Sequence, residues 1–528
     1  MATTTASARL PASYSRFLVR PLGALATAAI LAALGLAITI QFPQATPAAA
    51  LVGFVILAIA AWMAFEERYQ WSLVTLIVYL GLADGYLKLS TGIDKVTLVR
   101  DMLLYAIVAG ALVRIAVRRE QLALPPLAGW VIAWLVVVAI QVANPSNGTL
   151  YHSLAAIRPQ AEWVPLFFIA YFVMRSKQRL RGFLLLLVFV AAVNGAVSLV
   201  QSNLTPDELA AWGPGYEAAI IGEGENSVSA RGFADSSGEE RNRPFALGGD
   251  SGFGGALGLI AVPAALGLLA LSRRRGVRLL TILLSLGVVL AVATSASRTA
   301  VIGAVVAVFA FAALTVTSRA GLRTVFAVGL AATIAYASIG LLTSGVDQGA
   351  FDRYESISSP GEAVNTALDY RQETIARIPK YIVKYPLGSG FGRNGPAASL
   401  PGGPGPGLDS ESEPTFLLIE TGIPGLVVMF GFHLMLFYLA VTRIRRIRDR
   451  EARILLTAVA APLFALFVTW FVGVSTATTP GAPYLWFSAG VISFWLAGEG
   501  YRNLTRAPRS EEPAPDRTSP TLSAAPAG

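Results

Sequence analysis

Long apolar runs recur along the whole 528-residue chain. Most contain roughly 17–25 residues, which is enough for an α-helix to cross a lipid bilayer. Only 14% of the residues are charged and 54% are hydrophobic, whereas a soluble domain has about 25% charged residues. The sequence therefore predicts an all-α, polytopic membrane protein.

The hydropathy pattern predicts about 14 transmembrane helices with two long outer loops, at about 202–250 and 344–414. The helices are expected at about residues 21–40, 48–65, 70–86, 97–115, 125–143, 160–174, 182–201, 251–271, 279–296, 299–317, 323–343, 415–441, 453–473 and 482–499. The first run is too long for the core of a signal peptide, so an uncleaved span is expected there. Residues 1–504 form the predicted membrane domain, and 505–528, rich in Pro, Ser and Ala, form a predicted disordered cytoplasmic tail.

The charge pattern sets the expected orientation. With a cytoplasmic N-terminus, the inner segments hold most of the 41 Lys and Arg residues, and the outer segments hold most of the 32 Asp and Glu residues. This is the positive-inside bias of membrane proteins. It explains the net charge of +9 without a nucleic-acid partner, and it places both long loops outside.

Several enzyme classes lack their usual sequence cues. The chain has no cysteine and only two histidines, so a thiolate or histidine metal site is not expected. It has no Gly-Lys-Ser/Thr phosphate loop and no Asp-x-Asp pair. We expect no metal and no cofactor, and a reaction outside the cell would draw its driving force from an activated donor such as a lipid diphosphate.

Two arginines stand at the predicted outer ends of helices. Arg243 precedes a glycine-rich helix start that runs to Gly254, and Arg298 lies in a tight Ser-Arg turn between two apolar runs. Arginine beside the free N–H groups of a helix start is typical of an anion site. The alternatives are contact with lipid headgroups for the first and a snorkelling side chain for the second.

A cationic helix is expected from Arg371 to Lys384. At 100° per residue, Arg371 shares a stripe with Ile375 and Ile378, whereas Arg377 lies on the other side with the lysines. A guanidinium packed among apolar side chains needs an anion. We therefore expect Arg371 to bind substrate, with Arg377 closer to solvent or headgroups.

Carboxylates also gather at outer helix ends. Asp409, Glu411 and Glu413 precede the span that begins near Thr415, where negative charge also suits a helix N-terminus. Glu162 stands four residues after Arg158, so the two are candidates for substrate contact or for a simple ion pair.

These residues resemble the O-antigen ligase and O-antigen polymerase family of bacterial envelopes. The Ser297-Arg298 turn, the Pro386-Leu-Gly-Ser-Gly390 turn after Arg371, and a terminal span with Gly422 and Gly425 match the family pattern. Polymerases of the family have an arginine followed by ten residues and a glycine, and Arg243 to Gly254 and Arg377 to Gly388 match that spacing. The family has a histidine where this chain has Glu411.

The resemblance implies a glycosyltransferase in the bacterial inner membrane with its active site outside. A glycan on undecaprenyl diphosphate would be the donor, and another lipid-linked glycan (polymerase) or a distinct anchor (ligase) the acceptor. Glu411 would be the general base, and Arg298 and Arg371 would stabilise the diphosphate. Arg243, Arg377, Arg158, Glu162 and Glu413 would contact substrate.

Two other functions stay open at this point. A transporter or flippase for an anionic lipid-linked glycan could use the same arginines, but it would need charges or broken helices deep in the membrane. A non-catalytic binding protein would explain the missing histidine. No protein partner is specified by the sequence.

Overall fold

The computed structural model describes residues 47–66, 69–93, 96–118, 124–145, 147, 149–221, 232–234, 240–316, 376–393, 412–471 and 473–505. The expected spans at 21–40 and 323–343 and the tail from residue 506 lie outside these ranges. Apart from one short hairpin and the connecting turns, the described chain is helical, which confirms the predicted fold class.

The first half of the described chain contains ten α-helices and one π-helical turn. Their bounds are α2 (Pro47–Phe65), α3 (Gln70–Val78), the π-turn (Tyr79–Ala83), α4 (Asp84–Thr91), α5 (Thr97–Arg118), α6 (Ala128–Val142), α7 (Leu150–Ala161), α8 (Pro165–Val173), α9 (Lys177–Gln201), α10 (Pro206–Ala210) and α11 (Pro214–Ile220).

The second half begins with the hairpin and continues with long helices. The elements are β1 (Gly232–Ala234), β2 (Glu240–Asn242), α12 (Phe253–Leu271), α13 (Arg275–Ala293), α14 (Arg298–Thr315), a helix at 376–384, α18 (Glu413–Arg443), a 3₁₀ turn (Ile444–Arg446), α19 (Arg450–Thr469), α20 (Gly481–Ile492), a π-turn (Ser493–Ala497) and α21 (Glu499–Thr505).

Seven helical segments of the described chain are long and apolar enough to cross a membrane: 70–91, α9, α12, α13, α14, 413–446 and α19. The prediction of about 14 spans is therefore not reached in the described residues, although α2, α5 and α6 also lie where spans were expected. The expected span at 160–174 contains a turn and then only the short helix α8. The expected outer loop at 202–250 contains α10, α11 and the hairpin.

Helices α12 and α19 form the centre of the bundle. Helix α12 packs on α9, α13, α14 and α19, and most of its side chains are buried. Helix α13 is peripheral, and it exposes large apolar residues such as Leu279, Leu283 and Leu286. An exposed apolar face of this size indicates contact with lipid.

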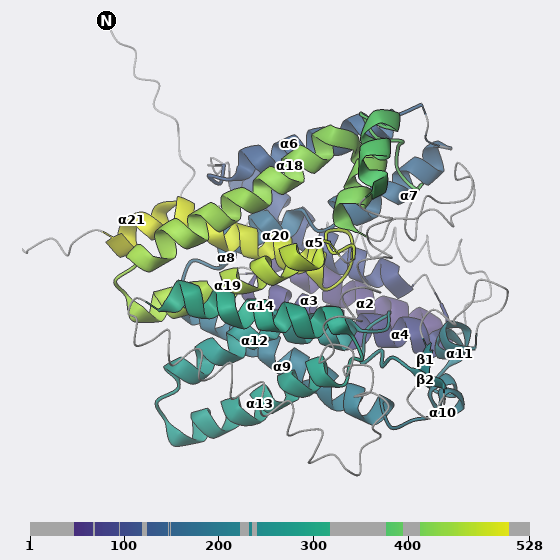
Figure 1. Ribbon diagram of the computed structural model, residues 1–528, viewed down its shortest axis with the longest axis horizontal. Helices are drawn as coiled ribbons and strands as arrows, with labels where there is room; N and C mark the ends of the chain where they lie inside the picture. The colour runs from purple at the N-terminus through teal and green to yellow at the C-terminus, as the bar shows by residue number, and fades with distance from the viewer. Residues whose placement is uncertain are drawn as a thin grey trace, which may run out of the picture.

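Different elements mark the two ends of the bundle. Helix α4 lies with α10, α11 and the hairpin at one end, which we call the loop end, and α21 lies at the opposite end (Figure 1). At the α9 and α19 starts, Lys177 Nζ lies 2.7 Å from Asp449 Oδ2, and Arg181 lies 3.0 Å from Glu451. The hydrogen bond from Lys177 lowers the pKa of the Asp449 carboxyl.

The π-turn between α3 and α4 has a tertiary cause. Asn194 Nδ2 of α9 donates to Gly81 O at 2.8 Å, so a neighbouring helix takes up this carbonyl. A Cβ at Gly81 would collide with Val190, and the two helices can approach this closely only because residue 81 is glycine.

Candidate functional site at the loop end

The Ser-Arg turn is a tight, hydrogen-bonded connection between α13 and α14. Ser297 caps α14 by accepting a hydrogen bond from Ala300 N at 3.3 Å, and Ser295 Oγ donates to Val292 O at 2.8 Å. Ala296 has a φ of 48°, a region that costs free energy for a residue other than glycine. Arg298 is therefore held in the first turn of α14, where its charge adds to the positive end of the helix dipole.

The segment that follows Arg243 is fixed by side chains of α9. Gln201 Nε2 donates to Ala246 O at 2.9 Å, and Gln201 Oε1 accepts from Ala246 N at 2.7 Å. Leu247 N donates to Asn194 Oδ1 at 3.0 Å. Helix α4 contributes Gly85, whose missing side chain lets the backbone of 248–249 lie against it.

The Arg243 segment and the Ser-Arg turn lie next to each other. Gly252 ends the segment with a φ of 84°, and a Cβ there would be 4.0 Å from Ser297 Cβ. Gly255 is closer still, since a Cβ would be 2.5 Å from Ser295 Oγ. The fold therefore brings the end of the Arg243 segment and the start of α12 to the Ser-Arg turn.

The Pro386–Gly390 turn docks backbone to backbone on α18. Gly422 interrupts α18 with φ 70° and ψ −166°, and Ile423 N donates to Pro386 O at 3.0 Å. A Cβ at Gly388 would lie 2.9 Å from Gly422 N. The two glycine motifs thus form one contact, and each leaves room for the backbone of the other.

The N–H groups of this turn are used by the protein. Ser389 N donates to Ile419 O at 2.7 Å, Phe391 N to Asn147 Oδ1 at 2.8 Å, and Gly392 N to the Glu420 carboxylate at 3.1 Å. In a phosphate loop, by contrast, such N–H groups point at the bound ligand. These three N–H groups are therefore not free to bind a phosphate, and they fix to the protein the turn that follows the helix at 376–384, which carries the half-buried Arg377.

Gly422→Ala is expected to destabilise the protein strongly, because alanine has to adopt a positive φ and its Cβ would collide with Gly388. The backbone strain alone costs about 1–3 kcal/mol. Gly182→Ala is the matched control, since a Cβ at this exposed glycine of α9 meets nothing within 4 Å. Thermal unfolding in detergent measures both, and an equal midpoint for the two variants would disprove the role of the glycine contact.

The end of α19 contacts both the start of α18 and the first part of α14. Glu413 of α18 is fully buried, and its backbone N donates to Trp470 O at 2.8 Å. The neighbouring Thr469 lies next to Gly303, which follows Arg298 by five residues. The Glu413 carboxylate accepts hydrogen bonds from Ser475 N at 2.6 Å and from Thr476 N at 3.0 Å. Glu413 thus connects the α18 start to the 475–476 segment.

Glu411 and Arg371 lie outside the described residues. The described chain resumes at Ser412, which caps α18 by accepting from Thr415 N, one residue after Glu411 in the sequence. Arg371 precedes the helix at 376–384 by five residues.

Arg158 and Glu162 form the ion pair that was one of the two sequence alternatives, and they belong to a larger network whose other members the sequence did not reveal. Arg100 Nε lies 2.8 Å from Glu162, and Arg100 also lies 3.3 Å from Asp84 and 3.5 Å from Asp101. Arg158 lies 2.8 Å from Asp101 and 3.5 Å from Glu162. The network joins α4, α5 and the α7–α8 turn. The available signal was the presence of charges inside or at the end of apolar runs.

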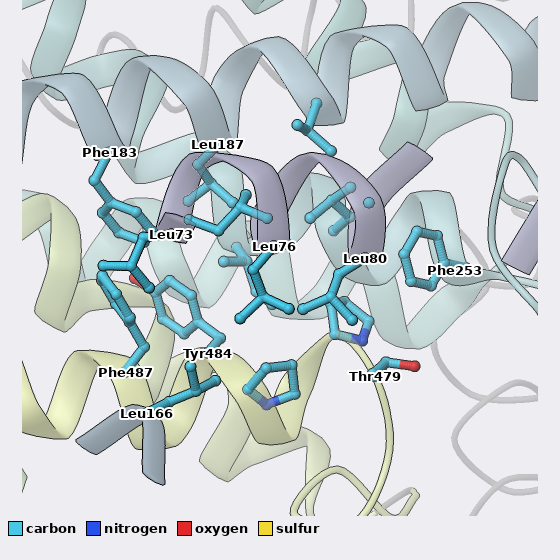
Figure 2. Close-up of a pocket in the computed structure, with 17 residues that line it drawn as sticks. Leu73, Leu76, Leu80, Leu166, Phe183, Leu187, Phe253, Thr479, Tyr484 and Phe487 are labelled. Atoms are coloured by element: carbon cyan, nitrogen blue, oxygen red, sulfur yellow. The ribbon is translucent and has the colours of Figure 1, made fainter. Parts of the chain in front are cut away.

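An apolar cavity of about 90 Å³ lies next to Phe253, just after the Arg243 segment. Phe253, the first residue of α12, and Thr479 lie at one end, and Phe183 and Phe487 lie at the other (Figure 2). The lining is almost entirely Leu, Ile, Val, Phe and Pro. The cavity has room for a few apolar carbon groups, and its Phe253 end is one residue from Gly252.

Within the ranges described above, no three His, Asp or Glu side chains form a group that could hold a metal ion. His433 is buried beside Trp470 and Phe467, with ring centroids 4.2 and 6.0 Å away. It is a packed aromatic residue of α18.

A match to a known protein family covers the region where the motifs meet. Residues 283–430 match the family described as O-antigen ligase, and this range includes Arg298, the 386–390 turn and Gly422. None of the curated proteins matches the chain. The match implies glycan transfer at a bacterial membrane, with a lipid-linked donor and an acceptor. The resemblance that the motifs predicted is confirmed over the matched region: residues 283–430 match the O-antigen ligase family, in a chain whose described part has seven helical segments long and apolar enough to cross a membrane.

Proposed function

We propose that the chain transfers a glycan from undecaprenyl diphosphate to an acceptor hydroxyl at the outer face of the bacterial inner membrane. The observation that carries this proposal is the meeting of the Arg243 segment with the Ser-Arg turn, inside or beside the family region. Two guanidinium-bearing segments next to a helix N-terminus favour a diphosphate ligand. Arg377, on the helix at 376–384 that leads into the 386–390 turn, and Arg371, five residues before that helix in the sequence, would complete the positive site.

In the proposed reaction the acceptor oxygen attacks the anomeric carbon and displaces the diphosphate oxygen, with inversion. Glu411 takes the proton of the acceptor hydroxyl, and the lipid diphosphate leaves. The arginines stabilise the negative charge that develops on the leaving group. They supply positive charge that a metal ion would otherwise provide, so we propose a metal-independent reaction.

Glu413, Arg158 and Glu162 have a different proposed role from direct substrate contact. The Glu413 carboxylate already accepts hydrogen bonds from the 475–476 segment, and Arg158 and Glu162 pair with each other and with Arg100 and Asp101. We propose that these three residues hold the walls of the site in place.

A specific feature of α18 bears on the transporter alternative. Helix α18 is broken at Gly422, as transporter helices often are. The break is filled, however, by the 386–390 turn, and Ser389 N and Oγ both donate to Ile419 O. A break that is closed by protein does not present its carbonyls to a transported ligand, which favours glycan transfer.

We propose that the apolar cavity beside Phe253 takes up a short part of the isoprenoid tail. Filling the cavity with Leu257→Phe is expected to raise the KM for a full-length lipid donor about tenfold, because one displaced apolar group is worth about 1–3 kcal/mol. A donor with a severely truncated tail should be unaffected. Leu283→Phe, on the exposed face of α13, is the matched control. Equal KM values for the long donor in both variants would exclude this cavity.

A further inference from the structure

The end of α6 and the segment after it carry three amide side chains that all contact the 386–392 turn. We propose that Gln141, Asn144 and Asn147, which we call the amide clamp, are positioning residues for the transfer reaction. The clamp sets the position of the helix at 376–384 relative to α18. This inference rests on the proposed function, because the helix at 376–384 carries Arg377 and follows Arg371.

Each member of the amide clamp binds the backbone of the turn. Gln141 Nε2 donates to Leu387 O, Asn144 Nδ2 donates to Gly388 O at 3.3 Å, and Asn147 Oδ1 accepts from Phe391 N at 2.8 Å. Backbone groups at both ends of the turn are therefore fixed from the α6 side.

The clamp is itself held in one geometry. Asn144 Nδ2 also donates to Gln141 Oε1 at 2.9 Å. Asn147 Nδ2 donates to Gln141 O at 2.8 Å and to Val142 O at 3.1 Å. Side chains that are fixed by their own hydrogen bonds can hold a reactive group precisely.

The opposite side of the turn is fixed to α18. Ile423 N bonds Pro386 O, Ser389 bonds Ile419 O through both its N and its Oγ, and Gly392 N bonds Glu420. The turn therefore lies between the clamp and α18 with contacts on both sides. A Cβ at Gly390 would collide with Asn147 Oδ1, so the fit of clamp and turn requires glycine there.

This arrangement transmits position to the arginine-bearing helix. The helix leads directly into the turn, since Tyr385 N donates to Tyr381 O at 2.8 Å and Gly388 N to Tyr385 O at 3.0 Å. The clamp lies outside the family match at 283–430. The first half of the chain thus helps to place a motif of the second half.

Asn147→Ala is expected to lower kcat about 100-fold, because a displacement of about 1 Å can cost that much in an oriented reaction. The KM for the lipid donor should change less than threefold. Asn147→Asp keeps the acceptor for Phe391 N but loses both Nδ2 donors, so it should recover part of kcat. Asn203→Ala is the control, because Asn203 is exposed and bonds only its own helix end.

A second readout does not depend on activity. The chain has no cysteine, so spin labels can be placed at Lys380→Cys and Val427→Cys, two exposed positions on the helix at 376–384 and on α18. The distance distribution between the labels should be narrow with an intact clamp and in Asn203→Ala, and broad in Asn147→Ala.

The outcomes separate the inference from the proposed function. If the wild-type protein transfers glycan but Asn147→Ala keeps its kcat per folded molecule, or if the label distance stays narrow, the clamp is not a positioning device. If the wild-type protein transfers nothing while the distance broadens in Asn147→Ala, the proposed function fails and the structural part of the inference stands.

Discussion

Arg298→Ala and Arg371→Ala are each expected to lower the rate of lipid diphosphate release about 10²–10³-fold, with normal expression. Removal of one preorganised group that stabilises developing charge typically costs this much. The expectation for Arg298 follows from its place at the α14 start, beside the Arg243 segment. The one for Arg371 follows from the sequence pattern, since this residue lies outside the described ranges.

The lysine variants sharpen this test. Arg298→Lys and Arg371→Lys should recover little activity, because an ammonium group cannot make the forked contact that a guanidinium makes with phosphate. Arg273→Ala, an exposed arginine in the turn between α12 and α13, is the control and should keep the wild-type rate. Wild-type rates in both Arg298→Ala and Arg371→Ala would contradict the proposed diphosphate site.

Arg100→Ala is expected to cost about 3–5 kcal/mol of folding free energy, because it leaves buried carboxylates without their partner. Arg100 pairs with Asp84, Asp101 and Glu162, and its side chain is only 15% exposed. Unfolding of the purified protein by denaturant in detergent measures the loss.

A combined variant tests the cause. Arg100→Ala together with Asp84→Asn and Glu162→Gln should regain part of the stability, since two of the uncompensated charges are removed. Arg275→Ala, at an exposed position at the start of α13, is the control. If Arg100→Ala unfolds like the control, the network is not a stabilising feature of the loop end.

The sequence predicted most helices well because a span needs a long apolar run. The runs at 182–201, 251–271 and 453–473 correspond to α9, α12 and α19 within a few residues, apart from the earlier start of α9 at Lys177. Hydropathy could not show where helices break. The π-turn at 79–83 is hydrogen-bonded by Asn194, more than a hundred residues away, and the turn at 162–164 lies within an otherwise helical pattern.

The candidate site was predictable where a motif determines the local structure. Ser297 and Arg298 stand at a helix start, as their residue types indicate, whereas the span expected at 415–441 as one continuous helix is broken at Gly422. The contact between Gly388 and Gly422, the ion network around Arg100 and the amide clamp join residues that are distant in the sequence. Side-chain amides have no periodic signal, so only the folded chain reveals their partners.

The most direct test of the account is to give the purified protein an undecaprenyl-diphosphate-linked glycan and an acceptor, and to measure lipid diphosphate released together with glycan joined to the acceptor. The wild-type protein is expected to give equal amounts of both products. Glu411→Gln should bind the donor but lose most turnover, and Glu411→His should keep some. Donor binding without any release of lipid diphosphate by the wild-type protein, with either a lipid-linked glycan or a distinct anchor as acceptor, would contradict it.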